Sequence, residues 1–332
     1  MRNESPIPEP QTDNDDFLNT VRDGLCLSPK SIPPKFFYDA QGSKLFDMIC
    51  TTPEYYPTRT ETGILETFGE QMATVIGTSS NIIELGSGSA TKTPLLLKHL
   101  EQDASYTPVD ICEPHLRQST QRLQAMFPAL QMKPVHADYT CMPSLELDDI
   151  DSQRQVVFFP GSTIGNSTPQ EAHDLLRQMA HLVGEDGAML IGVDSKKSPE
   201  ILNAAYNDAS GHTAAFNLNL LGRMQRELGA ELNENGFEHY AYYNAEIGRI
   251  EMHLVSKHKQ QILLNGDTFH FEPGETIHTE NSYKYTPDEF HALSKQAGWH
   301  PKMQWSDSEG LFNIHYLSLN ASEPRHLPRT VR

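Results

Sequence analysis

A glycine turn between an apolar strand and a helix is the stretch of this sequence best suited to bind a nucleotide. Residues 81–85 form a short strand candidate with Ile82 and Ile83 at its centre and the acid Glu84 near its end, and Gly86 and Gly88 follow it with one serine between them. Thr93 before Pro94 is expected to be an N-cap followed by proline at the first helical position, so a helix begins there. Strand, turn and helix form the first unit of a nucleotide-binding α/β sheet, in which glycine backbone can approach a ligand closely.

The spacing of this turn separates it from two better-known phosphate-binding motifs. A dinucleotide-binding G-x-G-x-x-G would need glycine at Thr91, and a phosphate loop would need glycine directly before Lys92. The acid-Leu-Gly-x-Gly form instead resembles motif I of S-adenosylmethionine (SAM) methyltransferases. We therefore expect SAM as the cofactor, with S-adenosylhomocysteine as its product, bound at Gly86, Gly88 and Lys92.

Acids at the ends of the next two expected strands suit the rest of this cofactor. Asp110 lies 24 positions after Gly86, where its two carboxylate oxygens can accept from both ribose hydroxyls. Asp138 can accept from the exocyclic amine of adenine, with the ring of Tyr139 packed nearby. Lys92, beside the turn, can hold the carboxylate of the methionine part.

A second glycine-rich segment, residues 159–166, follows the fourth expected strand, beside the expected methyl donor. Gly161 and Gly165 permit close backbone approach. Asn166 offers donors and an acceptor for the amine and carboxylate of an amino acid. The segment therefore predicts a site for the amino-acid end of a substrate.

A carboxylate and a hydroxyl near the C-terminal end of the sequence suit a heterocyclic ring. Glu280 and Ser282 are two residues apart on an extended segment, so both side chains face one side. Together they match a ring that carries one N–H and one bare ring nitrogen, which is imidazole.

The composition argues against partners with phosphate backbones. The 332 residues hold 26 Lys+Arg against 44 Asp+Glu, a formal charge of −18, which repels nucleic acid and anionic lipid. No apolar run reaches the roughly 18 residues needed to span a bilayer, and the N-terminus lacks the apolar stretch of a signal peptide. We expect a monomeric cytoplasmic enzyme that acts on a small molecule and binds neither nucleic acid nor membrane.

The metal-binding residue types are scattered. The cysteines contain no C-x-x-C pair, and the 15 histidines show no H-E-x-x-H or similar spacing, so we expect no metal site and no disulfide framework. The cysteines are Cys26, Cys50, Cys112 and Cys141.

Short apolar runs alternate with helical stretches through the first part of the chain, which indicates βαβ crossovers and a parallel sheet. A long helical stretch over residues 199–235 then leads to a strand at 246–255 and a hairpin at 260–271 that turns at Asn265-Gly266. The remaining expected strands are 81–85, 105–110, 132–139, 155–160, 188–194, 300–305 and 311–319, with helices at 113–127, 169–183 and 287–297.

The order of these elements predicts an α/β fold, a Rossmann-like seven-stranded sheet of the class I SAM-methyltransferase type with an inserted α+β substrate-binding domain. The class I order is an analogy rather than a derivation. The expected boundaries are 61–197 and 285–320 for the SAM-binding domain, 15–60 and 198–284 for the substrate-recognition domain, and 1–14 and 321–332 for disordered tails.

Four motifs occur together in order: residues 53–61, the glycine turn with Thr-Lys-Thr, residues 160–166 and residues 278–285. The set resembles the histidine-specific Nα-methyltransferase family, which makes trimethylhistidine (hercynine) for ergothioneine biosynthesis. The resemblance extends from about Leu25 to Leu319, nearly the whole chain.

This resemblance implies roles for individual residues. Tyr56, Asn166 and Tyr206 would hold the amino-acid end of the substrate, with Gly161 beside them, and Glu280 and Ser282 would bind the imidazole. Matching segments around them place Tyr38 near the amine, where it and Asn166 would be catalytic, and Met252 against the side chain. The implied SAM contacts are Gly86, Lys92, Asp110, Asp138 and Tyr139, the last replacing a phenylalanine that is common in the family.

Three alternatives stay open at this point. A relative that methylates tryptophan or a tryptophan derivative would share the fold, but an unpaired Glu280 carboxylate beside an indole would be costly to bury. A nicotinamide oxidoreductase would share the strand, turn and helix but expects glycine where Thr91 stands. A non-catalytic interaction protein would have no physical reason to keep the glycines, Asp110 and Asn166 together.

Overall fold

The computed structural model describes residues 13–100, 103–140 and 154–321, so the expected tails, apart from Asp13, Asn14 and Ala321, and Cys141 lie outside the described residues. The chain divides into two compact units. The first holds residues 1–37, 214–240 and 252–280, and the second holds 38–213, 241–251 and 281–332. The domain boundaries expected from the sequence at 61, 198 and 285 stay a prediction.

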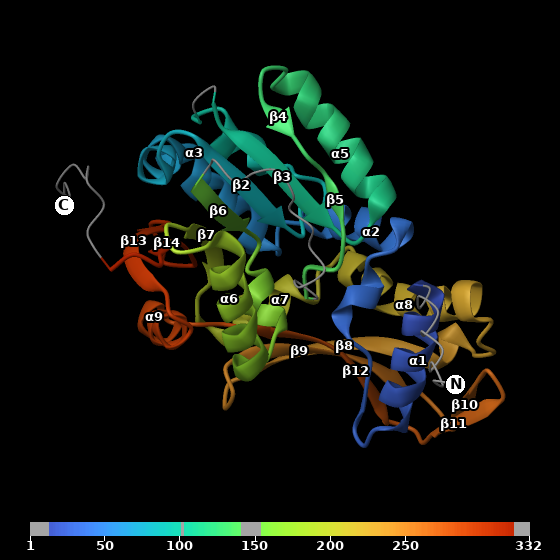
Figure 1. Ribbon diagram of the computed structural model, residues 1–332. Helices are drawn as coiled ribbons and strands as arrows, with labels where there is room; N and C mark the ends of the chain where they lie inside the picture. The colour runs from blue at the N-terminus through green and yellow to red at the C-terminus, as the bar shows by residue number, and fades with distance from the viewer. Residues whose placement is uncertain (1–12, 101–102, 141–153, 322–332) are drawn as a thin grey trace, which may run out of the picture. The chain divides into compact units, whose positions relative to one another are not determined.

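The second unit is built on a large, mostly parallel sheet with the strand order β13-β14-β7-β6-β2-β3-β4 (Figure 1). Strands β2, β3, β6 and β7 are parallel, and β14 runs antiparallel to both of its neighbours. This is the expected class I order, with a hairpin-linked final pair. The strands are β2 (Ser80–Leu85), β3 (Ser105–Asp110), β4 (Gln131–Met132), β6 (Arg154–Phe159), β7 (Ala188–Asp194), β13 (His300–Ser306) and β14 (Phe312–Ser318).

The third strand position differs from the expectation of one strand over residues 132–139. Two short strands lie there instead, β4 and β5 (Val135–His136), and both pair with β3. Pro134 stands between them, and because proline has no backbone N–H, it interrupts the hydrogen-bond ladder.

Helices cover both faces of this sheet, and strands β2, β3 and β7 are buried over their whole length. Residues such as Ile82 and Val156 pack on one face with helix α3, while Ile83 and Val157 pack on the other with α6 and α9. The helices of this unit are α2 (Ala40–Ile49), α3 (Tyr56–Ile76), α4 (Thr93–Leu97), α5 (Glu113–Met126), α6 (Pro169–Val183), α7 (Pro199–Ala205) and α9 (Pro287–Gln296).

Capping chemistry fixes where several of these helices begin. Thr168 before α6 and Thr286 before α9 each form a capping box with the glutamate three residues later, and each precedes proline. Thr93, expected as the N-cap of α4, is not one. The helix already includes it, and its hydroxyl donates instead to the buried Glu84 carboxylate at 2.8 Å.

The expected long helix over 199–235 is wrong, because two helices and a strand lie in and after that range. The first, α7, ends at Ala205, and α8 (His212–Leu228) begins after a turn. The Asp208 carboxylate accepts from the backbone N–H groups of His212 and Thr213 and so caps the new helix. Strand β8 (Phe237–Asn244), which the sequence interpretation missed, follows and forms a hairpin with β9 (Arg249–Ser256).

A four-stranded sheet with the order β1-β12-β9-β8 contains β1 (Lys30–Ser31) and β12 (Thr276–Tyr283). Strands β8, β9 and β12 each continue from one unit into the other. The predicted hairpin is confirmed as β10 (Gln260–Leu264) and β11 (Asp267–Phe271). Asn265 and Gly266 both have positive φ, 50° and 86°, as a two-residue hairpin turn requires.

Within the first unit, α1 (Asp13–Cys26) and α8 bring aromatic and cationic side chains together. The rings of Phe17 and Phe36 stack with centroids 4.5 Å apart, and the Arg223 guanidinium lies 4.7 Å from the Phe17 centroid. Asn217 of α8 donates to the backbone oxygen of His253 at 3.0 Å, which ties this helix to β9.

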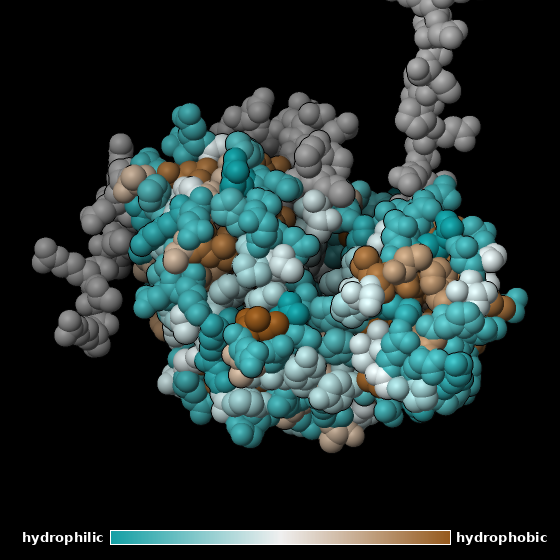
Figure 2. Space-filling view, turned by 90° about the horizontal axis from the view of Figure 1, so that it is seen from below, coloured by the Kyte–Doolittle hydropathy of each residue, from teal (hydrophilic) through white to brown (hydrophobic). Residues whose placement is uncertain are grey.

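Large apolar side chains on the surface are dispersed. Figure 2 shows separate brown patches on a mostly hydrophilic face. Among the described residues, no helix has the length and apolar character needed to cross a bilayer.

Candidate active site

The glycine turn after β2 has the backbone geometry that the sequence predicts. Gly86 and Gly88 have φ values of +69° and +51°, which side chains on L-residues disfavour. The N–H of Gly88 donates to the Asp110 carboxylate at 2.7 Å, and the other carboxylate oxygen accepts from the N–H of Cys112 at 2.8 Å. Because each oxygen can accept a further hydrogen bond, Asp110 retains the capacity to bind two hydroxyls.

Two further observations fit a ligand at this turn. The Ser87 hydroxyl is buried, yet it has no hydrogen-bond partner among the described residues, and buried polar atoms of this kind normally have one. A Cβ atom placed on Gly86 would lie 3.3 Å from the ring of Tyr139, so the turn passes close to that aromatic face. Tyr139, the aromatic residue predicted at the adenine, is therefore next to the turn. The carboxylate of Asp138 accepts from the backbone N–H of Thr140 at 2.9 Å.

A buried acid of α3 joins the two glycine-rich segments. Glu61 is fully buried and forms an ion pair with Lys92 of the first segment. Its two oxygens accept the N–H of Gly161, in the second segment, at 2.9 and 3.0 Å. A Cβ atom at Gly192 of β7 would lie 2.1 Å from an oxygen of this carboxylate, so a side chain there would displace Glu61. The charge of Lys92 is thus already compensated by Glu61.

The second segment forms a short 3-10 helix over Thr163–Asn166. Gly161 has a φ of +83°, and Ser162 before the helix has 59°. Gly165 is needed for a different close approach, because a Cβ atom there would lie 2.6 Å from the backbone oxygen of Tyr283. This packing places Asn166 at the end of the turn, where it is half-buried.

A network of buried charged and hydroxyl groups lies at the carboxyl end of β7. Asp194 is fully buried and accepts the hydroxyl of Tyr56 at 2.7 Å. The Lys284 ammonium group lies 2.8 Å from the same carboxylate, and Lys197 forms a second ion pair with it. Lys197 also donates to the Tyr56 oxygen at 2.6 Å. We refer to these residues, with Tyr206 and Ser282, as the Asp194 network.

The remaining members of the Asp194 network meet at Lys284. Its ammonium group lies 2.7 Å from the Ser282 oxygen and 3.2 Å from the Tyr206 oxygen. The Tyr206 hydroxyl in turn donates to Ser282 at 2.8 Å. Tyr56 and Tyr206, predicted at the amino-acid end, and Ser282, predicted at the ring, are therefore brought into one hydrogen-bonded group.

The charges of the Asp194 network follow from burial and proximity. Burial raises the pKa of Asp194, but the two ammonium groups outweigh it and hold the pKa below its ordinary value. Burial opposes the charge of Lys284, whose pKa nevertheless lies above the ordinary value because of Asp194. For Lys197 burial is the larger effect, and the pKa falls to about 8. At pH 7 the Asp194 network therefore carries two positive charges and one negative charge.

Aromatic rings extend from the Asp194 network to Tyr38. The rings of Tyr206 and Tyr55 lie edge to face, with centroids 6.1 Å apart. Phe46 continues the series, 6.2 Å from Tyr55 and 5.8 Å from Tyr38. Such rings offer flat, electron-rich faces to a cation.

Met252 and Glu280 belong to the first unit and are both buried, at 1% and 8% exposure. They lie on β9 and β12, which are neighbours in the four-stranded sheet. The hydroxyl of Thr279 donates to the Met252 oxygen at 3.1 Å across these strands. Glu280 and Ser282 both lie in β12, so the expectation of an extended segment with both side chains on one face is confirmed.

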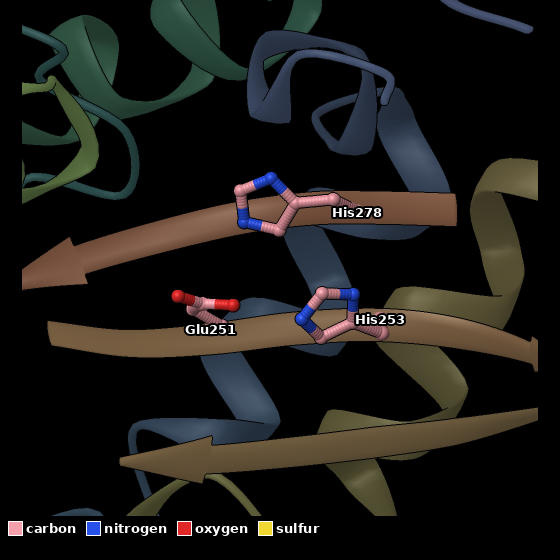
Figure 3. A group of neighbouring side chains, drawn as sticks. All are labelled: Glu251, His253 and His278. Carbon is pink, nitrogen blue, oxygen red and sulfur yellow. The ribbon is translucent and has the colours of Figure 1, made fainter. Parts of the chain in front are cut away.

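Figure 3 shows Glu251 and His253 on β9 and His278 on β12. The two imidazole rings lie 5.0 Å apart. The Glu251 carboxylate is engaged by the Arg249 guanidinium at 2.8 Å and by the Tyr242 hydroxyl at 2.9 Å. A cation already neutralises this acid, which disfavours a second cation, and the expected lack of a metal stays a prediction.

The sequence interpretation missed Glu61, Asp194, Lys197 and Lys284 as site residues. Signals for three of them were present in the sequence. Glu61 and Lys284 stand inside two of the four motifs, and Asp194 ends an apolar strand in the same way as Asp110 does. Their charges are visible in the sequence, but their mutual contacts arise only from the fold.

Comparison with known proteins identifies the family. A family profile described as "Histidine-specific methyltransferase, SAM-dependent" matches residues 17–319. The chain is 38% identical over 301 residues to the histidine N-alpha-methyltransferase of Mycolicibacterium smegmatis, covering 89% of this chain and 92% of that protein. It is 35% identical over 300 residues to the protein of the same name from Mycobacterium tuberculosis, with the same two shares.

A third relative is ergothioneine biosynthesis protein 1 of Schizosaccharomyces pombe, 28% identical over 286 residues, which cover 80% of this chain and 37% of that protein. The profile match spans most of the chain, and the strand order and glycine turn agree with a SAM-dependent enzyme. The chain therefore belongs to the family of histidine-specific, SAM-dependent methyltransferases.

Proposed function

We propose that this enzyme transfers methyl groups from SAM to the α-amino nitrogen of L-histidine and continues to trimethylhistidine (hercynine), the first step of ergothioneine biosynthesis. The observation that carries the proposal is the Asp194 network, which joins residues expected at the amino-acid end, Tyr56 and Tyr206, to Ser282, expected at the ring. The names of the M. smegmatis and S. pombe relatives support the substrate and the pathway.

The net charge of the Asp194 network suits the carboxylate of an amino acid. Lys197 and Lys284 together exceed Asp194 by one positive charge, and all three side chains are nearly or fully buried. A buried excess charge is costly unless it is compensated, so an anionic group of the ligand is favoured beside it. Asn166 would add neutral hydrogen bonds to the amine and carboxylate.

The proposed roles at the ring end are those expected from the sequence. Glu280 would accept the imidazole N–H, and Ser282 would satisfy the other ring nitrogen. Met252 would pack against the side chain. A carboxylate at this place disfavours an indole, because part of its hydrogen-bonding capacity would stay unused when buried.

For the cofactor we propose contacts from the backbone of Gly86 and Gly88, from Asp110 at the ribose, and from Asp138 and Tyr139 at the adenine. When bound, SAM supplies a methyl group on a positively charged sulfur, a strong electrophile. Lys92 would act together with Glu61 beside the methionine part, since these two side chains already form an ion pair. We propose the SAM-binding and substrate-recognition domains with the boundaries expected from the sequence.

The residues of the chain then have a limited chemical task, which is to hold a neutral amine in line with the methyl group. Tyr38 and Asn166 would orient that amine. The ammonium form must lose a proton before each transfer, and tyrosine or carboxylate groups can assist this step. Burial and the adjoining Asp194 carboxylate raise the pKa of Tyr56. Its hydroxyl therefore stays protonated and is unsuited to accept a proton as a base. The faces of Tyr38 and Tyr55 would accommodate a trimethylammonium group.

Mass spectrometry of the products tests the proposal. The enzyme is incubated with SAM and L-histidine, and the reaction is sampled over time. We expect mono-, di- and trimethylated histidine in sequence, with trimethylhistidine accumulating and the imidazole unmodified. Methylation of a ring nitrogen, or arrest after one methyl group, would contradict the proposal in its full form. The monomeric, cytoplasmic state is part of the same proposal and is tested by the mass of the enzyme in solution and by its location in the cell.

A further inference from the structure

We propose that Lys284 fixes the Ser282 hydroxyl as a hydrogen-bond donor toward the ligand, so that the site selects a ring with a bare nitrogen lone pair. This inference rests on the proposed function, because the ring is taken to be the imidazole of histidine. It assigns Lys284 as a positioning residue for substrate specificity, acting through Ser282.

Lys284 uses all of its hydrogen-bonding capacity within the protein. An ammonium group has three hydrogens to donate and accepts none. Its nitrogen lies 2.8 Å from an Asp194 oxygen, 2.7 Å from Ser282 and 3.2 Å from Tyr206. Each hydrogen thus has an acceptor within the protein, and the side chain is only 1% exposed. Lys284 has no hydrogen left to offer a ligand and acts only on its protein neighbours.

The Ser282 hydroxyl already accepts as many hydrogen bonds as it can. A hydroxyl group has one hydrogen and two acceptor lone pairs. Ser282 accepts from Lys284 at 2.7 Å and from the Tyr206 hydroxyl at 2.8 Å, so both lone pairs are occupied. Only its own hydrogen remains available. Since Ser282 is 3% exposed and buried polar groups are normally paired, that hydrogen favours an acceptor on the ligand.

Asp194 keeps this arrangement in place. Without a carboxylate, burial would favour the neutral amine form of Lys284, which could itself accept a hydrogen bond. The ion pair with Asp194 keeps the ammonium form across the neutral pH range. The donor role of Ser282 is therefore built into the folded protein and does not depend on the ligand.

The ligand must match this fixed direction. Neutral imidazole has one nitrogen with a lone pair and one with a hydrogen. The lone pair would accept from Ser282, and the N–H would donate to Glu280, two residues earlier on the same face of β12. A pyrrole ring has the N–H but lacks the lone pair, and an indole lacks it as well. The site would then distinguish imidazole from pyrrole, which have nearly the same size and shape.

Histidine and its pyrrole analogues are the direct probes. In 3-(pyrrol-2-yl)-L-alanine and 3-(pyrrol-3-yl)-L-alanine the ring has no bare nitrogen. For the wild-type enzyme we expect kcat/KM for histidine to exceed that for the better pyrrole analogue by roughly 100-fold or more, as expected where a buried polar group of the site would stay unpaired. In Lys284→Met one lone pair of Ser282 becomes free, so the hydroxyl can turn, and the ratio should fall by about tenfold.

Lys197→Met is the matched control. This change removes the other buried lysine that forms an ion pair with Asp194. Lys197 contacts Tyr56 and not Ser282. Its ratio should stay within about twofold of the wild-type ratio, whatever happens to kcat/KM itself. Ser282→Ala alone should lower the ratio of kcat/KM for histidine to that for the pyrrole analogue. The double variant Ser282→Ala, Lys284→Met should have the same ratio as Ser282→Ala alone.

The variants remain testable for folding. Lys284→Met leaves Asp194 paired with Lys197 and so removes the excess charge rather than creating one. SAM binding and thermal unfolding are measured on the same samples. A wild-type ratio in Lys284→Met, or an undiminished effect of that change in the Ser282→Ala background, would overturn the inference. If the wild-type enzyme does not methylate histidine at all, the proposed function fails instead, so the two failures are distinguishable.

Discussion

The glycine turn and the Asp194 network both lie at the carboxyl ends of strands in the large sheet, but they are built in different ways. The turn is made of consecutive residues, and its contacts to Asp110 come from the backbone N–H of Gly88. The Asp194 network is made of side chains from residues as far apart as Tyr56 and Lys284. The turn provides backbone geometry for a cofactor that many enzymes share, whereas the Asp194 network provides charges suited to one substrate.

This difference determines how each region should respond to mutation. A region built on backbone geometry keeps its shape when a single side chain is removed and loses only that side chain's contact. A network of buried charges depends on its balance, so the loss of one member leaves others uncompensated.

The largest effect should come from Asp194→Asn. This change leaves Lys197 and Lys284 buried without their shared counter-charge, and breaking a buried ion pair costs about 3–5 kcal/mol. We expect a loss of this size in the free energy of unfolding, measured in urea at pH 7. Lys284→Met, which lowers the net charge instead, should cost clearly less. Equal losses for both variants would show that charge balance is not what holds the Asp194 network together.

At the cofactor end, Glu84 provides a pH-dependent contrast. Burial raises its pKa to about 7 from 4.5, although hydrogen bonds from Tyr106 and Thr93 oppose the increase. A raised pKa in the folded state means that its stabilising contribution is complete below about pH 4.5 and is lost as the pH rises through 7. The difference corresponds to about 3 kcal/mol.

Glu84→Gln, which does not titrate, should therefore lack this decline. The free energy of unfolding is measured for both proteins from pH 4.5 to 8. All other groups titrate in both, so the difference between the two curves isolates Glu84. A difference that does not change with pH would mean that the carboxylate stays ionised throughout.

Asp110→Ala tests the backbone-built region directly. It should weaken SAM binding by roughly 1.5–3 kcal/mol, the range for lost hydrogen bonds to a charged group, with little change in global stability. Titration calorimetry with SAM measures the effect, and NADH serves as the negative control. Unchanged SAM affinity would remove Asp110 from the cofactor site, and tight NADH binding would favour the oxidoreductase alternative.

Glu280→Ala should change substrate choice more than overall stability. The imidazole N–H loses its acceptor, at a cost of roughly 1–3 kcal/mol in kcat/KM for histidine. Combining it with Met252→Val should open space for larger apolar rings such as indole. The ratio of histidine to tryptophan methylation in a mixture is the measurement. If both variants had the wild-type ratio, Glu280 would not be a residue that selects the imidazole ring.

The fold and the cofactor end were predictable because they depend on local patterns. The alternation of apolar runs and helical stretches predicted a mostly parallel sheet, and its strand order came by analogy with class I methyltransferases. The two glycines with positive φ were identified from their spacing. The Asp194 network was not predictable as a unit. The types of Asp194 and Lys284 can be read from the sequence, but their contact joins residues 90 positions apart. It depends on where the fold places the end of β7 and the residue that follows β12.

Local conflicts explain the errors in secondary structure. Thr93 is a good N-cap by type, but the buried Glu84 needs a donor, and its hydroxyl fulfils that role instead. The range 199–235 does carry a break signal, the turn-forming residues Asn207, Asp208, Ser210 and Gly211, which the prediction of one long helix passed over. Asp208 caps α8 at this place. Strand β8 was missed because it pairs with β9 on the other side of a short turn, and pairing depends on the partner.

The most direct test of the whole account is a competition among the twenty amino acids. The wild-type enzyme is incubated with SAM and an equimolar mixture of them, and the methylated products are identified by mass spectrometry. We expect histidine to be consumed first and to appear as its Nα-trimethyl form, while tryptophan stays unmodified. Preferential methylation of tryptophan, or of several amino acids without preference for histidine, would contradict this expectation.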